Sequence, residues 1–231
     1  MALSRTERNA PHPHTAAGCK HFSPLSVNGS RSYLFMKRLL DIFGALAGLV
    51  LLSPVFLVIA LFIKKEDPGH PVIFKQVRLG KNGKPFYIYK FRSMIPNAEA
   101  LLDNLRDQNN VTGAMFKIKD DPRITRIGHF IRKSSLDELP QLVNVLKGEM
   151  TLVGPRPPLP GEVADYSDYD RQRLLVTPGC TGLWQVSGRS DLSFDQMVEL
   201  DLSYIANRSL LLDAKIMIKT VFVMFGSDGA Y

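Results

Sequence analysis

The sequence predicts an α+β protein that is mostly helical, with a re-entrant membrane helix, a small cytosolic α/β domain and interfacial amphipathic helices. Three observations support this fold class. Residues 42–63 carry no charged side chain, and about 20 apolar residues suffice to span a bilayer. Two β-branched and aromatic runs, at 72–78 and 85–91, flank a turn that contains Gly and Asn. Apolar residues then recur at helical spacing through much of the remaining chain.

The composition fits one domain with appendages. The chain has 231 residues and a net charge of +7, which favours anionic partners such as phosphorylated compounds or an acidic membrane surface. No nucleic acid is expected, because the basic residues are spread among membrane and core elements without a helix-turn-helix or zinc pattern. Cys19 and Cys180 are too few and too distant for a disulfide framework, which favours a reducing, cytosolic setting. Residues 1–35 are polar and aperiodic, and we expect a disordered tail.

The uncharged segment has a break near its middle, at Ser53-Pro54. Proline removes a backbone donor and clashes with the preceding helical turn. Basic pairs flank both ends, Lys37-Arg38 and Lys64-Lys65, and such pairs favour the cytoplasmic side. We therefore expect residues 36–65 to enter the membrane, bend at the break and leave on the same face, with a kinked spanning helix as the alternative. Asp41, at the start of the segment, is expected to pair with Arg38 or to cap the helix.

The pattern at residues 72–91 predicts a β-hairpin whose second strand ends in basic side chains. Residues two apart in a strand point to the same face, so Lys90 and Arg92 are expected to lie side by side. They are either paired phosphate ligands or an ordinary solvated face. Helical periodicity marks the later segments 97–109, 124–133, 162–175, 194–207 and 210–225. The last is short for a span and is expected to lie in the membrane interface or to pack on the core.

Two adjacent carboxylates, Asp137 and Glu138, follow the basic pair Arg132-Lys133. The spacing of Ser135 and Glu138 fits a capping box, in which Glu138 would only bond a backbone N–H. Pro140 places a helix start just before it, because proline is tolerated in the first turn. The alternative is chemical. A phosphate docks at the positive end of a helix, and a carboxylate there can stay ionised as a nucleophile or metal ligand.

Further along, Arg156 lies between prolines in the sequence Gly-Pro-Arg-Pro-Pro, with Pro157 directly after it. The prolines fix the backbone and lower the cost of holding a guanidinium, which suits bidentate phosphate recognition. A turn-rich segment, TGLWQVSGRSD, then carries Gln185 and Arg189. Arg189 either brings a cation to an anionic ligand or marks an ordinary hairpin end.

Together these motifs resemble those of the polyprenyl-phosphate sugar-1-phosphate transferases, the monotopic bacterial phosphoglycosyl transferases. The resemblance runs from about residue 37 to the C-terminus, in the order KRLLDI, Ser53-Pro54, QVRLGKNGKPFYIYKFRSM, SLDELPQLVNVLKGEM, LVGPRP, PGCTGLWQVSGR and LDLSYI. No single motif is specific, but their joint order and spacing are. They favour the chemical interpretation of the two carboxylates. Larger members carry extra N-terminal membrane helices, so the resemblance implies a compact version with the catalytic unit alone.

The resemblance implies a two-step exchange. Asp137 would attack the β-phosphate of a UDP-sugar and release UMP, and undecaprenyl phosphate would then take the sugar phosphate. Glu138 would help hold Mg²⁺ on the diphosphate. Galactose or glucose is implied, although no residue identifies the hexose. The positions assigned to substrate binding are Lys90, Arg92, Arg132, Arg156, Pro157, Gln185 and Arg189.

The resemblance also implies a location, the inner leaflet of the bacterial cytoplasmic membrane, with residues 66–231 on the cytosolic side as the catalytic domain. There a soluble nucleotide sugar and a lipid phosphate both reach the site, for the first membrane step of exopolysaccharide or surface-glycan synthesis. A second copy of the chain and other glycan-assembly enzymes are further candidate partners. The alternative from another class is a non-enzymatic, membrane-associated module that binds anionic lipids, in which Asp137 and Glu138 act only as caps.

Overall fold

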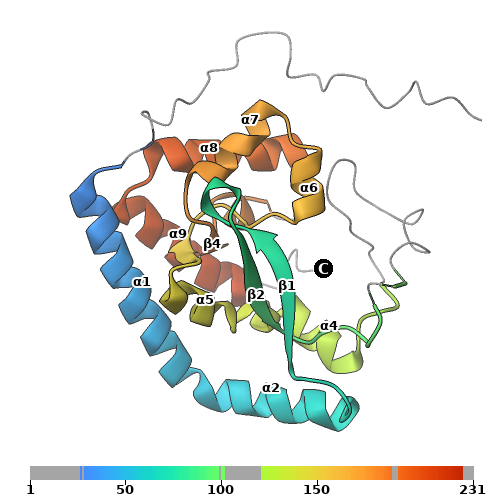
Figure 1. Cartoon of the computed structure of the whole chain (residues 1–231). Coiled ribbons are helices and arrows are strands. Elements are labelled where there is room, and N and C mark those ends of the chain that lie inside the picture. The colour runs from blue at the N-terminus through green and yellow to red at the C-terminus, as the bar shows by residue number, and fades with distance from the viewer. Residues whose placement is uncertain (1–26, 28, 99, 102–120, 189–191, 226–231) are drawn as a thin grey trace, which may run out of the picture.

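The computed structural model describes residues 27, 29–98, 100–101, 121–188 and 192–225. Helices and two small sheets alternate along the chain, which confirms the mixed class (Figure 1). Helices α1 (Arg31–Leu51) and α2 (Ser53–Glu66) run along one side of the molecule, and the remaining elements pack inside their angle. Helix α1 therefore extends into residues 31–35, which had been assigned to the tail. Most of that tail lies outside the described residues.

The junction between α1 and α2 is a sharp bend of 59°. It falls at Leu52, next to the predicted break, and Pro54 occupies the first turn of α2. The missing N–H of proline is tolerated in a first turn, and the Val50 carbonyl accepts the Ser53 hydroxyl instead, at 2.8 Å. No described helix alone is long and apolar enough to cross a membrane, and only this bent pair meets the length and composition requirement jointly.

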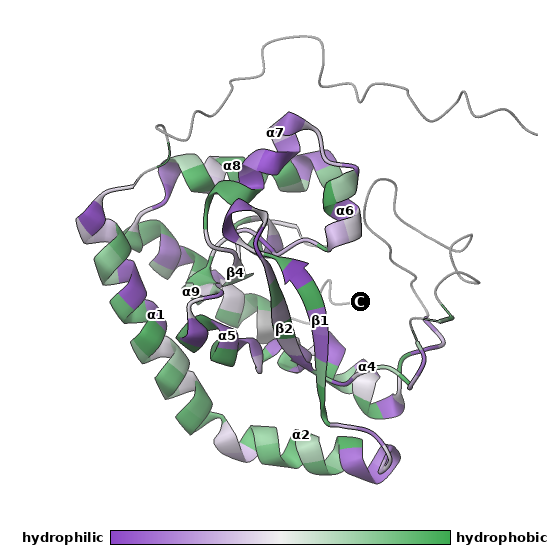
Figure 2. Cartoon of the chain, in the orientation of Figure 1, coloured by the Kyte–Doolittle hydropathy of each residue, from purple (hydrophilic) through white to green (hydrophobic). Residues whose placement is uncertain are grey.

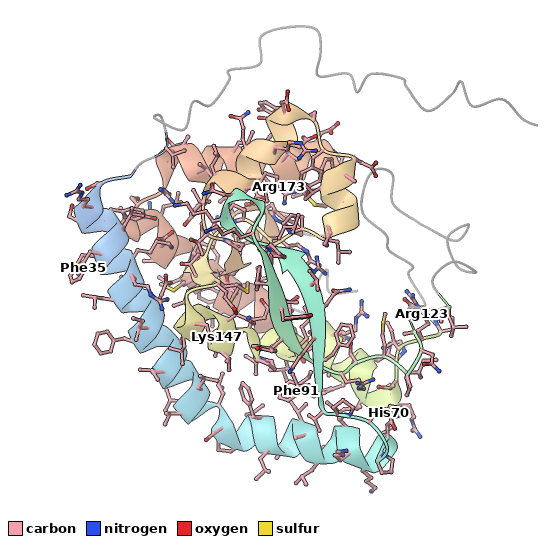
Figure 3. The ribbon with its side chains drawn as sticks, viewed as in Figure 1. Phe35, His70, Phe91, Arg123, Lys147 and Arg173 are labelled. Atoms are coloured by element: carbon pink, nitrogen blue, oxygen red, sulfur yellow. The ribbon has the colours of Figure 1, made fainter. Side chains whose placement is uncertain are left out.

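The outward faces of α1 and α2 are apolar. Figure 2 shows hydrophobic residues along both helices, and Figure 3 shows Phe35 directed away from the rest of the molecule. Phe43 is 67% exposed and Leu51 76% exposed. The other large apolar side chains exposed on this face are Leu34, Phe35, Met36, Leu40, Leu46, Val50, Leu57, Val58, Leu61 and Phe62. A continuous apolar surface of this kind marks an interaction with a membrane or a partner.

Three polar residues of α1, here called the α1 anchor, fix this helix to the rest of the chain: Lys37, Arg38 and Asp41. Lys37 pairs with Asp213 at 2.8 Å, and Arg38 donates to the carbonyls of Val145 and Leu146. Asp41 accepts from the Thr151 hydroxyl at 2.7 Å and from the Leu152 N–H at 2.8 Å. The prediction that Asp41 pairs with Arg38 or caps the helix was therefore wrong. The donors that reach it come from a strand distant in sequence.

The predicted hairpin is present. Strand β1 (Ile73–Leu79) pairs antiparallel with β2 (Pro85–Phe91), from Leu79 opposite Pro85 to Ile73 opposite Phe91. Between them η3 (Lys81–Gly83) makes the turn. Asn82 and Gly83 both have a positive φ there, 57° and 72°, a conformation that Asn and Gly adopt more easily than other residues.

A second sheet is formed by β3 (Thr151–Val153) and β4 (Gly179–Thr181), which pair in parallel. The chain between them was predicted as one helix over 162–175. It forms three short pieces instead, α6 (Pro160–Ala164), α7 (Asp168–Arg171) and η6 (Gln172–Leu175). Ser167 explains the interruption, because it caps a new helix with Asp170 as its capping-box partner. A Cβ on Gly179 would lie 2.1 Å from the Gly154 nitrogen, so only glycine allows this close approach.

Helix α5 (Gln141–Lys147) packs between α1 and the hairpin. Its Asn144 is fully buried and bonds both ways to β2: the side-chain oxygen accepts from the Tyr89 N–H at 3.0 Å, and the side-chain nitrogen donates to the Tyr87 carbonyl at 2.7 Å. A buried amide with its hydrogen bonds satisfied is rigid and position-specific. Asn144 thereby fixes α5 against the hairpin.

Helices α8 (Phe194–Asn207) and α9 (Leu210–Phe225) have the predicted bounds. They form the main core with Val153 and Val176 through Val198, Leu202, Tyr204, Ile205 and Ile216. The opposite face of α9 exposes Leu211, Ile218, Val221 and Phe222. Helix α9 therefore packs on the core, as one of its two alternatives predicted, and leaves a second apolar surface exposed.

Helix α4 (Arg126–Lys133) matches the predicted segment 124–133. Glu66, the last residue of α2, accepts the N–H groups of Arg126 at 2.9 Å and Ile127 at 3.1 Å. These two bonds join the end of α2 to α4, the helix that carries Arg132. Most of the predicted helix over 97–109 lies outside the described residues.

Candidate active site

The two adjacent carboxylates lie in a short 3-10 turn, η5 (Leu136–Glu138), here called the carboxylate turn. Ser135 before it has a left-handed backbone, φ 55°, and makes no capping hydrogen bond. The capping-box prediction was therefore wrong, and α5 starts only at Gln141. Glu138 instead pairs with Lys90, with 2.6 Å between Oε1 and Nζ. A charge-assisted bond of this kind is stronger than a neutral cap.

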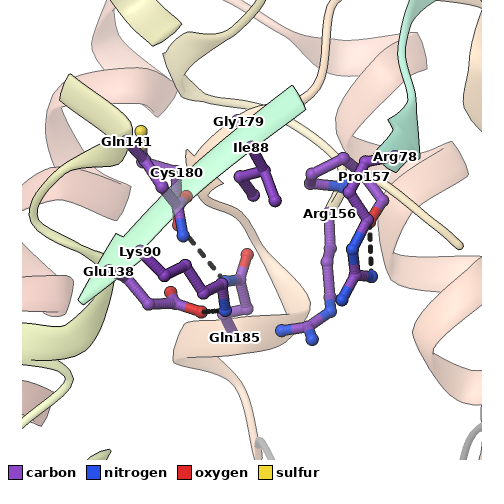
Figure 4. A pocket seen from close by; sticks show the side chains of 10 residues that line it. All are labelled: Arg78, Ile88, Lys90, Glu138, Gln141, Arg156, Pro157, Gly179, Cys180 and Gln185. Atoms are coloured by element: carbon purple, nitrogen blue, oxygen red, sulfur yellow. Dashed lines mark hydrogen bonds and ion pairs between the residues drawn. The ribbon is translucent and has the colours of Figure 1, made fainter. Parts of the chain in front are cut away.

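Lys90 and Glu138 line a cleft of about 230 Å³, here called the cationic cleft. Figure 4 shows this pair on one side and Arg78 and Arg156 on the other. The lining residues come from both sheets, the carboxylate turn, α5, the Pro-rich segment and the 3-10 turn η7 (Trp184–Val186): Arg78, Ile88, Lys90, Glu138, Gln141, Arg156, Pro157, Gly179, Cys180 and Gln185. Three cations face one carboxylate among these residues, so the cleft favours an anion.

Arg78 is a buried member of the cleft, 6% exposed, and donates to the Pro157 carbonyl at 3.1 Å and to the Gln76 side chain at 3.0 Å. Burial, aided by the positive charge of Arg156, lowers its pKa to about 10. It therefore stays charged at neutral pH. Its bond to Pro157 also holds the segment that carries Arg156.

The two carboxylates have opposite pKa shifts. Burial raises the pKa of Asp137 to about 6, and the charge of Glu138 adds to the rise while Lys90 and Arg132 oppose it. Burial also disfavours ionised Glu138, but the charges of Lys90, Arg156 and Arg78 outweigh this and lower its pKa. Neighbouring acids whose pKa values are shifted in opposite directions are typical of sites in which the two acids have different chemical roles.

The predicted site residues fall into three groups. Lys90, Glu138, Arg156, Pro157 and Gln185 line the cationic cleft. Asp137 is 9% exposed and lies beside the cleft rather than among its lining residues, and Arg132 on α4 is near enough to lower its pKa. Two remain. Arg92 follows the end of β2 and its Nε donates to the Pro71 carbonyl at 2.8 Å, away from the cleft. Arg189 lies outside the described residues.

Arg78, Gln141 and Cys180 line the cleft but were not predicted. Arg78 had a signal in the sequence. A hairpin with Leu79 opposite Pro85 places Arg78 opposite Phe86, and directly opposed residues share a face, so Arg78 belongs to the face of Lys90. Gln141 and Cys180 had no local signal, because β4 and α5 meet the hairpin only in the folded chain.

The side chains at the site determine whether it can hold a metal ion. No group of three or more His, Cys, Asp or Glu residues that could hold an ion occurs among the described residues. Mg²⁺, however, commonly takes one or two carboxylates and completes its shell with substrate phosphates and water. Asp137 and Glu138 fit that pattern, and they do not fit a site made of protein ligands alone.

Comparison with known proteins agrees with this geometry. A family model described as bacterial sugar transferase matches residues 32–227. The chain is 49% identical over 200 residues to the galactosyl transferase CpsE of Streptococcus agalactiae, covering 86% of this chain and 44% of that protein. It is 47% identical over 205 residues to the undecaprenyl-phosphate galactose phosphotransferase of Salmonella typhimurium, covering 87% and 43%.

A shorter relative is matched over most of its length. The chain is 40% identical over 199 residues to the exopolysaccharide production protein ExoY of Rhizobium meliloti, covering 84% of this chain and 88% of that protein. The chain thus spans less than half the length of the two galactose-named relatives and most of ExoY. From the family match and these identities, the chain belongs to the bacterial sugar transferase family.

Proposed function

We propose that the protein transfers a hexose 1-phosphate, galactose or glucose, from a UDP-sugar to undecaprenyl phosphate and releases UMP, as the first membrane step of exopolysaccharide or surface-glycan synthesis. The observation that carries this proposal is the carboxylate turn. It places a buried Asp137 and an ionised Glu138 at the edge of a cleft with three cations. The names of the relatives, which mention galactose and undecaprenyl phosphate, support the substrates.

In the first step a carboxylate oxygen of Asp137 attacks the β-phosphorus of the UDP-sugar. A bond forms between this oxygen and phosphorus, the bond from phosphorus to the bridging oxygen breaks, and UMP leaves with the electron pair. Phosphoryl transfer depends on positioning and on neutralising the phosphate oxygens. Arg156 and Lys90 supply that neutralisation from the two sides of the cleft.

In the second step a phosphate oxygen of undecaprenyl phosphate attacks the same phosphorus. The bond between Asp137 and phosphorus breaks, the carboxylate is restored, and the sugar is left on a lipid diphosphate. Splitting the transfer through a carboxylate is established chemistry for phosphoryl groups. Asp137 must be deprotonated for the first step, and its burial keeps it poorly solvated and therefore reactive.

Glu138 would hold Mg²⁺ together with the diphosphate oxygens. When bound, the ion supplies positive charge to the oxygens of the transferred group. The low pKa of Glu138 keeps this carboxylate ionised for that role. Lys90, which pairs with Glu138 at 2.6 Å, would bind a phosphate oxygen in the same cleft.

The apolar faces of α1, α2 and α9 support a monotopic location in the inner leaflet, with both ends of the bent pair on the cytosolic side.

Cysteine labelling at the two ends of the bent pair tests this topology. Lys37 is a poor position for labelling because it is engaged in the α1 anchor. Arg31 and Lys65 are exposed at the two ends, so each is replaced by Cys in a chain with Cys19 changed to Ser. An impermeant thiol reagent outside intact cells should label neither position. Labelling of one of them would establish a spanning helix.

Asp137→Asn tests the nucleophile. We expect UMP release from UDP-galactose to fall by at least roughly 10³-fold, as for other covalent nucleophiles, with the thermal unfolding temperature retained. Wild-type protein incubated with UDP-galactose and no lipid acceptor should gain the mass of one hexose phosphate on the peptide that contains Asp137. Asp165→Asn, at an exposed aspartate, is the matched control.

The same assay separates the transferase from a lipid-binding module. A module would bind anionic vesicles equally well with either residue at position 137, and its wild type would release no UMP from any UDP-sugar. Near-normal UMP release by Asp137→Asn would instead remove Asp137 from the mechanism.

A further inference from the structure

A second pocket, of about 250 Å³, adjoins the cationic cleft and shares Arg156 with it. Its walls include Tyr166, Trp184 and Phe194, and we call it the aromatic pocket. Each pocket alone is too small for a nucleotide sugar. A ligand that fills both would pass Arg156, with its phosphates in the cationic cleft and another part among the aromatic rings.

The aromatic walls are held in place by a buried ion pair. Arg173 pairs with Asp201 at 2.7 Å and donates to the Tyr166 hydroxyl at 2.9 Å. Its guanidinium also lies 5.8 Å from the ring centre of Tyr166 and 6.0 Å from that of Phe194. The two rings are 5.5 Å apart and tilted by 47°. The Arg173 guanidinium covers one face of each ring, so a planar ligand ring would contact their remaining faces and edges.

Trp184, on the wall of this pocket, has a donor without a partner in the described part of the chain. Its side chain is 6% exposed, and the indole nitrogen has no hydrogen-bond partner among the described residues. The indole N–H is a donor only, and leaving it unsatisfied in a buried position is unfavourable. A planar ligand with a carbonyl oxygen at its edge would satisfy this donor. A pyrimidine base has both features.

We propose that the aromatic pocket binds the uracil base of the nucleotide donor, with the Trp184 N–H donating to a carbonyl oxygen of the base. Arg156 then lies at the junction between nucleoside and diphosphate. Glu162, also on the pocket wall, offers a carboxylate oxygen to the ribose hydroxyls. This assignment rests on the proposed function, because it takes a uridine nucleotide as the donor.

Trp184 is the only tryptophan in the chain, so intrinsic fluorescence reports on this pocket alone. The full chain in detergent is titrated with UMP and, separately, with ribose 5-phosphate, which has the phosphate and sugar but no base. UMP should quench or shift the emission and ribose 5-phosphate should leave it unchanged. UMP that binds in equilibrium dialysis without changing the emission would overturn the assignment.

Trp184→Phe removes the N–H and keeps an aromatic ring. Its Kd for UMP, measured by equilibrium dialysis, should rise roughly tenfold, the loss of one buried hydrogen bond, while the Kd for ribose 5-phosphate stays the same. Tyr87→Phe, at a 57% exposed ring on the hairpin outside both pockets, should change neither value. An unchanged Kd for UMP in Trp184→Phe contradicts the assignment.

The assignment and the proposed function fail in different ways. If Trp184→Phe still releases UMP from UDP-galactose with an unaltered KM, the uracil assignment is refuted and the proposed transferase activity is not. UMP binding that depends on Trp184, in a protein that releases no UMP from any UDP-sugar, keeps the pocket and removes the transferase. A wild-type chain that does not bind UMP removes the pocket.

Discussion

The α1 anchor and the carboxylate turn each contain a buried aspartate, and the two aspartates are in opposite states. Asp41 is 5% exposed, and both of its oxygens accept hydrogen bonds, from Thr151 and Leu152. Asp137 is 9% exposed and accepts no hydrogen bond from another side chain among the described residues, while charged groups surround it. The Asp41 carboxylate has its hydrogen bonds made within the fold, and it connects α1 to β3. The second keeps its oxygens available for chemistry.

The two regions also differ in how well their positive and negative charges are matched. In the α1 anchor the Lys37 cation is matched by Asp213, and Arg38 bonds the carbonyls at the end of α5, where a cation is favoured by the helix dipole. In the cationic cleft the cations outnumber the carboxylate that lines it. A balanced polar cluster holds elements together, whereas an unbalanced one attracts a ligand of the opposite charge. The following substitutions test this distinction.

Arg156→Ala should have the largest effect. Removing a preorganised donor for a phosphate oxygen typically costs about 10²–10³-fold in rate, so kcat/KM for UMP release should fall by that factor with little change in thermal stability. Arg38→Ala, the matched change in the α1 anchor, should lower the unfolding temperature and leave kcat within about twofold. Arg156→Ala with a rate within tenfold of wild type would contradict the role of the cleft.

Asp41→Ala should destabilise the protein by about 2–4 kcal/mol, because it leaves two buried donors unsatisfied. Asp137→Asn should leave stability unchanged or raise it at pH 8, since burial disfavours the ionised form of Asp137. Denaturant unfolding of both variants in the same detergent measures the difference. Equal destabilisation by the two changes would mean that both aspartates are structural.

Lys90→Met should move the pH dependence of the reaction. Ionised Asp137 is the reactive form, so kcat/KM is lost as pH falls through its pKa, which burial raises to about 6. Lys90 opposes that rise, so its removal should raise the pKa further and shift the acid limb to higher pH by about one unit or more. Initial rates of UMP release between pH 5 and 8 measure this, and an acid limb that moves down would show that another group controls it.

Glu66→Gln should have the smallest effect. The amide oxygen accepts one of the two N–H groups at the start of α4, which bond separate oxygens of Glu66, and the other N–H turns to water because the site is exposed. The favourable interaction of the charge with the helix dipole is also lost, so we expect a change of about 1 kcal/mol. Stability should drop slightly and UMP release should change by less than about twofold. A large loss of rate without a loss of stability would instead make Glu66 part of the site.

Sequence patterns predicted the elements that local chemistry determines. The hairpin followed from alternation and its Gly-Lys-Asn-Gly turn, and α8 and α9 followed from helical periodicity. Alternation also placed Lys90 on the cleft face, but it misplaced Arg92, because the strand ends at Phe91 and the next side chain turns to Pro71. Strand alternation predicts the direction of a side chain only within the strand itself.

The remaining site residues depend on contacts between distant segments. Glu138 was compatible with a cap by spacing alone, and only the approach of Lys90 from β2 shows which bond it makes. Cys180 joins the cleft because β4 pairs with β3, which Gly154 and Gly179 permit. Asp41 was ambiguous for the same reason, since its donors lie 110 residues away at Thr151.

Asn144 connects these parts with a consequence for ligand affinity. It bonds the backbone on both sides of β2 residue Ile88, close to Lys90, from the helix that follows Glu138. Lys90 and Glu138 are therefore fixed relative to each other when the chain folds. A ligand that binds there does not have to order them, and the conformational entropy that would otherwise oppose binding is already lost. The affinity of the cleft for a diphosphate thus depends in part on a buried amide that never touches it.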